Sequence, residues 1–158
     1  MRAVTSSLAI GVVLAAAVAL VSAQATNPRI GTWHLNVAAS KYSPGPAPKS
    51  QILTITAAGA AEAVTSETVS ASGQKTSTAY TASYDGKPSP LKGSEIADTV
   101  ALKRIDDHTS ERTDSKGGKV VQTYTRVVSK DGKTMTVTVK GTNAQGQAVH
   151  NVVVFEKH

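Results

Sequence analysis

Strand-like segments separated by short turn signals run all along this chain, and none has the apolar spacing of a helix. The clearest covers 133–141, where Met135, Val137 and Val139 alternate with threonine and lysine. This alternation has the period of a half-buried strand. The Asp-Gly and Ser-Gly pairs between such segments are typical of tight hairpins. The pattern therefore predicts an all-β protein made of consecutive antiparallel hairpins.

We expect about nine full strands, over 31–37, 51–57, 62–71, 74–84, 97–105, 108–115, 119–129, 133–141 and 147–157. Segment 87–95 has two prolines and a glycine, so we expect at best a broken edge element there. Consecutive hairpins favour a meander over a Greek key. An open meander would expose two long edges, and closure removes them. We expect an antiparallel up-and-down meander that closes into a barrel, with a β-sandwich as the alternative.

Residues 1–23 have the features of a secretory signal peptide. A positive start precedes an uncharged apolar stretch over 8–21, and small residues allow cleavage after Ala23 or Ala25. The stretch is shorter than the roughly 20 residues of a membrane-spanning helix, so we expect no stable membrane anchor. We predict export to the periplasm or the extracellular space, and a single β-barrel domain over 24–158.

The composition excludes several functions. The chain has no cysteine, which excludes disulfides, thiol chemistry, and metal or haem sites that need cysteine. The four histidines lie in separate segments without metal-ligand spacing, and no nucleophile motif occurs. We therefore predict no catalytic residue, metal or cofactor. Although the net charge is +6, the basic residues are scattered and no nucleic-acid platform is visible. The sequence does not give the oligomeric state.

A Gly-x-Trp motif opens the first expected strand, as Gly31-Thr32-Trp33. It resembles the signature of the calycins, which include lipocalins, fatty-acid-binding proteins and avidins. In that resemblance Gly31 would turn the chain at the base of the barrel, and Trp33 would plug the base. The ending Val154-Phe155-Glu156-Lys157 resembles the last strand of fatty-acid-binding proteins.

Three longer segments resemble a largely uncharacterised group of small secreted bacterial lipocalin-like proteins. They begin at Gly31, Ser40 and Ser129 and read Gly-Thr-Trp-His-Leu-Asn, Ser-Lys-Tyr-Ser-Pro-Gly and Ser-Lys-Asp-Gly-Lys-Thr-Met-Thr-Val-Thr. This resemblance extends over most of the mature chain and implies that the meander closes into a lipocalin-like barrel of about nine strands.

The chain departs from the fatty-acid-binding proteins at two places. Those proteins have two helices after the first strand, where this chain has a proline-rich loop over 43–49 that we expect near a barrel mouth. Their final strand carries an Arg-x-Tyr that binds the ligand carboxylate, and the matching positions here are Val153 and Phe155. Arg126 could replace that anchor, stack on Trp33, or lie at the surface.

These features predict a secreted, non-enzymatic protein that binds a small apolar or amphipathic ligand in a cavity of about 300 Å³ or more. The alternative is a ligand-free structural or interaction module whose Thr/Lys-rich surface contacts an anionic matrix polymer. A lipocalin-type enzyme is a third hypothesis, which a perturbed carboxylate or histidine inside the cavity would favour. The predicted ligand-binding residues are Trp33, Leu35, Tyr80, Tyr84, Tyr124, Arg126, Met135, Val137, Val139, Val153 and Phe155.

Overall fold

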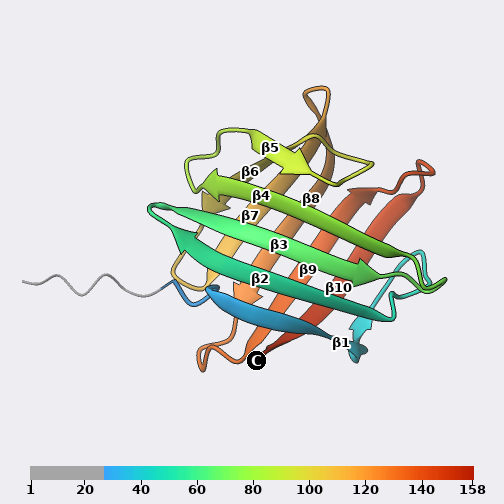
Figure 1. Ribbon diagram of the computed structural model, residues 1–158, viewed down its shortest axis with the longest axis horizontal. Coiled ribbons are helices and arrows are strands. Elements are labelled where there is room, and N and C mark those ends of the chain that lie inside the picture. Colours follow the sequence, from blue (N-terminus) through green and yellow to red (C-terminus); the bar gives the residue numbers. More distant parts are fainter. Residues whose placement is uncertain (1–26) are drawn as a thin grey trace, which may run out of the picture.

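The computed structural model describes residues 27–158, which form one closed barrel of ten antiparallel strands (Figure 1). Each strand pairs with its neighbours in the chain, and β1 pairs with β10 to close the barrel. The strands are β1 (Gly31–Lys41), β2 (Ser50–Ala58), β3 (Ala61–Val69), β4 (Lys75–Ser83), β5 (Ser89–Lys92), β6 (Thr99–Arg104), β7 (Thr109–Lys116), β8 (Lys119–Val128), β9 (Thr134–Thr142) and β10 (Ala148–Lys157). The expected all-β meander barrel is confirmed.

The expected signal peptide and both cleavage sites lie outside the described residues. Within residues 27–158, no helix is long and apolar enough to cross a membrane.

The tenth strand is the segment that we expected to be a broken edge element. The short strand β5 pairs with β4 and β6 on its two sides and places Leu91 inside the barrel, so it is not an edge. Gly93 follows with a φ of 76°, and a Cβ atom there would lie 2.0 Å from the carbonyl oxygen of Ser77. Only glycine allows this close passage over β4. The prolines therefore shorten the strand without removing it.

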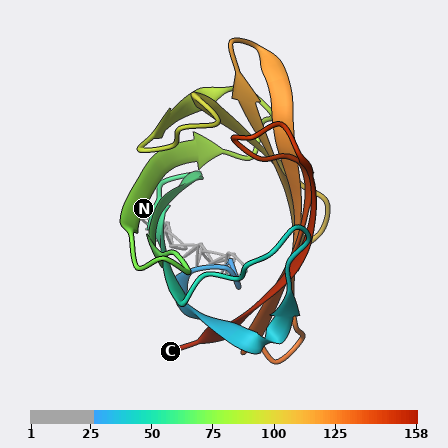
Figure 2. The same ribbon diagram turned by 90° about the vertical axis from the view of Figure 1, so that its right-hand side faces the viewer.

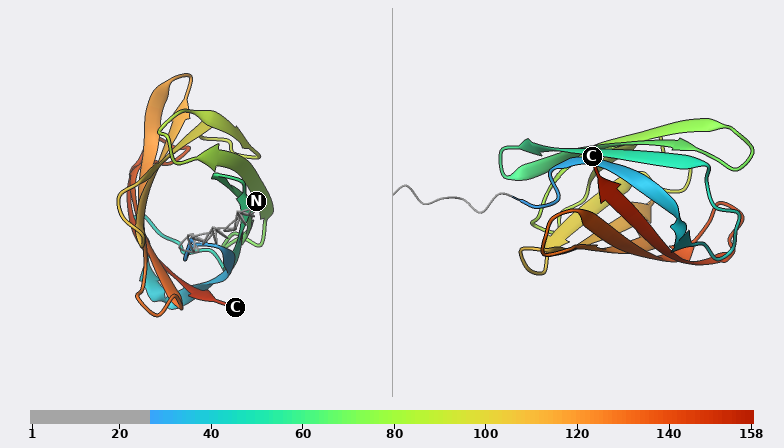
Figure 3. Two further views of the ribbon diagram at one scale, coloured as in Figure 1. Left: turned by 90° about the vertical axis from the view of Figure 1, so that its left-hand side faces the viewer. Right: turned by 90° about the horizontal axis from the view of Figure 1, so that it is seen from below.

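The two ends of the barrel differ. At one end, called the base, the described chain begins and Gly31 turns into β1 with a φ of 139°. Trp33 is fully buried and donates a hydrogen bond from Nε1 to the carbonyl oxygen of Arg29 at 2.8 Å. At the other end, called the mouth, the proline-rich loop over 42–49 crosses from β1 to β2 (Figure 2). Figure 3 shows the base end in its left panel and the barrel seen from below in its right panel.

Most inward-facing apolar side chains are small. Valine and alanine supply much of the buried core, and Trp33, Phe155 and Tyr80 are its buried aromatic residues. Small side chains on a barrel of this many strands do not fill its interior. The space that remains lies on the mouth side and forms the candidate site.

Candidate ligand-binding cavity

An internal cavity of about 230 Å³ occupies the mouth-side half of the barrel. Its lining includes Ile55, Val64, Arg126 and Phe155, whereas Trp33 at the base does not reach it. The cavity is smaller than the expected 300 Å³ or more, because several inward side chains near its lower end are long and charged. The interior is nevertheless not packed solid.

A wider vestibule joins the cavity at the mouth. It measures about 600 Å³ and is lined by Tyr42, the three prolines of the loop and the turn before β10. The loop therefore lies at the mouth, as expected from the sequence. Both spaces share a set of lining residues, which places them next to each other: Gln51, Thr68, Tyr124, Val139 and Val153. A ligand entering through the vestibule would reach the cavity directly.

Eight of the eleven predicted residues line the cavity. Three do not: Trp33 plugs the base, Leu35 packs against the core from β1, and Tyr84 lies toward the base. The structure brings together Tyr80, Tyr124, Arg126, Met135, Val137, Val139, Val153 and Phe155. Contact between these residues and a ligand stays a prediction.

One side of the cavity is apolar. Its residues come from β2, β9 and β10, which lie close together around the closed barrel because only β1 separates β2 from β10. We call this surface the apolar wall: Leu53, Ile55, Met135, Val137, Val139, Val153 and Phe155.

The other side includes Val64, Leu91 and Ile96 but also carries the charged and aromatic side chains. The charged and aromatic residues come from β3, β4, β7 and β8. From the sequence, only its two tyrosines and Arg126 were predicted to bind a ligand; the two carboxylates and the second arginine were not predicted. We call this group the charged wall: Tyr80, Arg112, Asp114, Tyr124 and Arg126, which line the cavity, and Glu62, the partner of Arg126, which does not.

An ion pair crosses the lumen at the lower end of the cavity. Nη1 of Arg126 on β8 lies 2.6 Å from Oε1 of Glu62 on β3. Four strands separate β3 from β8 in either direction around the barrel, so the pair joins opposite sides. The hydroxyl of Tyr80 donates to the same carboxylate oxygen at 3.1 Å. Because the next inward residue of β3 toward the mouth, Val64, lines the cavity and Glu62 does not, these three residues form its floor.

Beneath the floor, a second arginine extends the network toward the base. Nε of Arg29 donates to the hydroxyl of Tyr84 at 3.1 Å, and that hydroxyl donates in turn to Oε2 of Glu62. The Arg29 side chain is fully buried, and its Nη1 and Nη2 have no hydrogen-bond partner among the described residues. The floor is thereby connected to the loop that carries the Trp33 hydrogen bond.

Higher on the charged wall, Arg112 lies between two aromatic rings. Its guanidinium is 4.8 Å from the ring centre of Tyr80 and 4.7 Å from that of Tyr124. Asp114 accepts two hydrogen bonds from it, each 2.7 Å long. The Tyr124 hydroxyl donates to Oε1 of Gln122 at 2.5 Å. Two-point pairing and stacking hold the guanidinium in one orientation.

The floor carboxylate is held in its ionised form. Burial raises the pKa of Glu62, but the charge of Arg126 and the hydrogen bonds from Tyr84, Arg126 and Tyr80 outweigh burial and leave the pKa below its usual value. Burial also raises the pKa of the Tyr80 hydroxyl. A carboxylate that stays ionised and does not line the cavity is poorly placed for acid–base work near neutral pH. It therefore does not favour the enzyme hypothesis. No cluster of histidine, aspartate and glutamate within 27–158 could hold a metal ion.

The structure corrects two of the three readings of Arg126. The residue is 5% exposed, so it is not a surface residue, and it pairs with Glu62 rather than stacking on Trp33. The cation over the Trp33 ring is Lys157, with Nζ 4.8 Å from the ring centre.

One sequence signal was available for Glu62, which shares the inward face of β3 with Val64. A charged residue on an apolar face needs a buried partner.

No family model matches the chain, and no curated protein matches it. Among solved structures, it is similar to zebrafish ileal bile acid-binding protein complexed with cholic acid, with a TM-score of 0.50 and 15% sequence identity. The match covers 83% of this chain and 99% of that chain. At this identity the likeness shows the fold alone, a closed antiparallel β-barrel similar to that of fatty-acid-binding proteins. The closer resemblance to secreted bacterial lipocalin-like proteins stays a prediction.

Proposed function

We propose that this protein is an exported, non-enzymatic binding protein that holds a small amphipathic ligand in its barrel. The observation that carries the proposal is the two-sided cavity, with the apolar wall facing the charged wall below an open vestibule. Binding sites typically combine a mostly apolar lining with a few placed polar groups. The fold it shares with a protein that binds cholic acid supports the same class of function. Export rests on the signal-peptide features of residues 1–23.

The cavity sets the size of the ligand. About 230 Å³ lies just below the usual range of ligand pockets, about 300–1,000 Å³, so the cavity itself takes only a small ligand or one end of a longer ligand. A longer ligand would extend into the vestibule beneath the proline-rich loop. Its polar end would face the charged wall.

The test combines native mass spectrometry of the purified mature protein with displacement of a neutral fluorescent dye, N-phenyl-1-naphthylamine. We expect a co-purified small molecule or saturable dye binding. Val139→Trp, which fills the border between cavity and vestibule, should abolish the binding. Thr138→Trp, on the opposite face of β9, is the matched control and should bind like the wild type. A clean apo mass without dye uptake would contradict the proposal.

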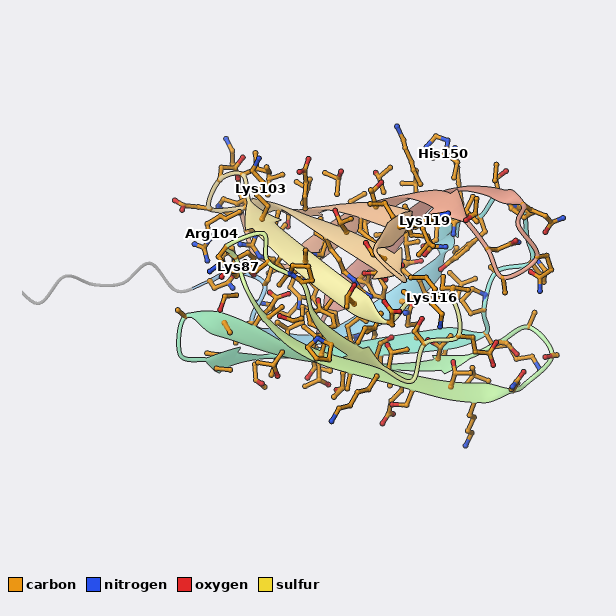
Figure 4. The ribbon with its side chains drawn as sticks, turned by 90° about the horizontal axis from the view of Figure 1, so that it is seen from above. Lys87, Lys103, Arg104, Lys116, Lys119 and His150 are labelled. Carbon is orange, nitrogen blue, oxygen red and sulfur yellow. The ribbon has the colours of Figure 1, made fainter. Side chains whose placement is uncertain are left out.

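The alternative function, a ligand-free module that binds an anionic polymer, has one observation in its favour. Lys87, Lys103 and Arg104 lie near one another at the base end, whereas Lys116, Lys119 and His150 lie further toward the mouth (Figure 4). The backbone hydrogen bond from Gly86 to Leu102 holds the two basic segments of the base together. Retention on heparin that is lost with salt would support this function, particularly if no dye binds.

A further inference from the structure

Resting on the proposed function, we infer that the ligand is an uncharged amphipath, such as a long-chain alcohol or ester, and not a carboxylate. The charge balance of the charged wall carries this inference. Each of its two guanidinium groups is paired with a carboxylate, Arg126 with Glu62 and Arg112 with Asp114. The wall that faces the ligand therefore has no net charge.

The floor residues mostly hydrogen-bond to one another. Oε1 of Glu62 receives hydrogen bonds from Tyr80 and Arg126, and Oε2 receives the one from Tyr84. On the arginine, Nε donates to Ser110 at 3.0 Å and Nη1 to the carboxylate, whereas Nη2 is buried without a partner among the described residues. The unused hydrogen-bonding groups of this arginine are the two N–H donors of Nη2, which match an oxygen acceptor but are covered by protein atoms, so a ligand oxygen reaches them only if a neighbouring side chain shifts.

A ligand carboxylate would fit this floor poorly. It would bring a second negative charge to a guanidinium that Glu62 already neutralises, and burying an uncompensated charge is costly. Arg112 offers no better anchor, since Asp114 neutralises its charge and occupies one edge of its guanidinium, whose carbon lies 4.8 and 4.7 Å from two tyrosine ring centres. The remaining buried cation, Arg29, does not line the cavity and contacts Tyr84 on the base side of the floor. A hydroxyl or carbonyl oxygen would accept a hydrogen bond from a guanidinium N–H without adding charge.

The test compares 1-decanol with decanoate, which have equal chain lengths, by isothermal titration calorimetry at about pH 8, where the acid is ionised. We expect the wild type to bind the alcohol at least about tenfold more tightly, which is about 1.4 kcal/mol. Glu62→Gln removes the compensating charge from the floor. We expect it to shift the ratio of the two dissociation constants by about tenfold or more toward decanoate.

The control is Glu67→Gln, which removes the same charge from the exposed outer face of the same strand. It should leave the ratio unchanged. If Glu62→Gln fails to fold, Asp114→Asn makes the same test at Arg112. The wild-type comparison decides the inference even without variants.

The outcomes separate the inference from the proposed function. Tighter binding of decanoate by the wild type would overturn the inference and leave the binding function standing. An unchanged ratio in a folded Glu62→Gln or Asp114→Asn variant would also overturn the inference alone. Absence of binding by both probes and by the dye would overturn the proposed function, and the inference with it.

Discussion

The apolar wall and the charged wall enclose the same cavity but are built in different ways. The apolar wall rests on strand alternation, as in β9, where Met135, Val137 and Val139 all face inward. The charged wall depends on partners from distant parts of the chain, because Glu62 and Arg126 are 64 residues apart. The pattern within each strand decides which residues form the apolar wall, whereas the contacts of the charged wall form only when the barrel closes.

This difference affects stability as well as recognition. Apolar side chains on one wall can lose or gain volume with moderate cost, because the cavity already leaves them partly unpacked. Buried charges are less tolerant, since removal of one partner leaves the other uncompensated. We therefore expect the charged wall to be the more sensitive to single substitutions.

The largest expected effect is on the floor. Glu62→Ala should lower the free energy of unfolding by about 3–5 kcal/mol, because it leaves Arg126 buried without its counter-charge. Urea denaturation measures the loss. Glu67→Ala on the outer face of β3 should stay within about 0.5 kcal/mol of the wild type. Equal effects of the two substitutions would remove the distinction between the floor and the surface.

A smaller loss is expected on the apolar wall. Met135→Ala should cost about 2–3 kcal/mol, the lower part of the usual range for such a truncation, because Met135 is fully buried yet lines an existing cavity. The variant should still bind the neutral dye, since the added volume is continuous with the cavity. Urea denaturation and dye titration check both results. A loss larger than that of Glu62→Ala would reverse the ranking of the two walls.

Acid should lower the stability of the protein because Glu62 of the charged wall takes up a proton. The pKa of Glu62 in the folded protein lies below its usual 4.5, so the unfolded chain takes up the proton first as the pH falls. The stabilisation is complete above about pH 4.5 and is lost as the pH falls toward the folded pKa, by up to about 1.4 kcal/mol per pH unit for this group. Urea denaturation as a function of pH should show this loss of unfolding free energy.

The control for the acid effect is Glu62→Gln, which has no carboxyl group at this position. Its stability should fall less steeply below about pH 4.5 than that of the wild type. Asp106 and Asp131, whose pKa values are also lowered, lie in exposed turns and are present in both proteins. Identical pH profiles would show that Glu62 does not contribute to acid sensitivity.

The smallest expected effect concerns the upper part of the charged wall. Tyr124→Phe removes the hydrogen bond to Gln122 but keeps the ring over Arg112, so it should cost only about 0.5–1.5 kcal/mol. Thermal denaturation with and without dye would measure the change. A loss of stability comparable to that of Glu62→Ala would mean that the hydroxyl of Tyr124, and not its ring, makes the main contribution to the stability of this part of the wall.

Much of the fold could be predicted from local patterns. Hairpin turns marked the strand ends, and the Gly-x-Trp motif placed Trp33 in the buried base. The short strand β5 was expected only as an edge, because prolines weaken a strand locally while its neighbours on both sides supply the pairing. The inward residues of β9 followed from alternation, whereas Val153 and Phe155 of β10 stand in a continuous apolar run and were named from the resemblance to fatty-acid-binding proteins.

The charged wall could not be predicted in this way. Segment 108–115 is wholly polar, so alternation gives no sign of which side chains face inward, and the structure places Ser110 and Asp114 in the buried interior. The pairing of Arg126 with Glu62 depends on which strands stand opposite each other in the closed barrel. No spacing in the sequence carries that information.

The sequence by itself determined the meander, the buried tryptophan and five of the seven residues of the apolar wall, all but Leu53 and Ile55, because alternation and turn chemistry act between near neighbours in the chain. Tertiary structure alone decided the size of the cavity, its floor and its charge balance. These depend on side chains that meet across the lumen from β3, β4, β7 and β8. Such contacts form only when closure brings opposite strands face to face. Closure also buries Arg112 and Arg126, and burial of a charge is costly unless a partner such as Asp114 or Glu62 compensates it.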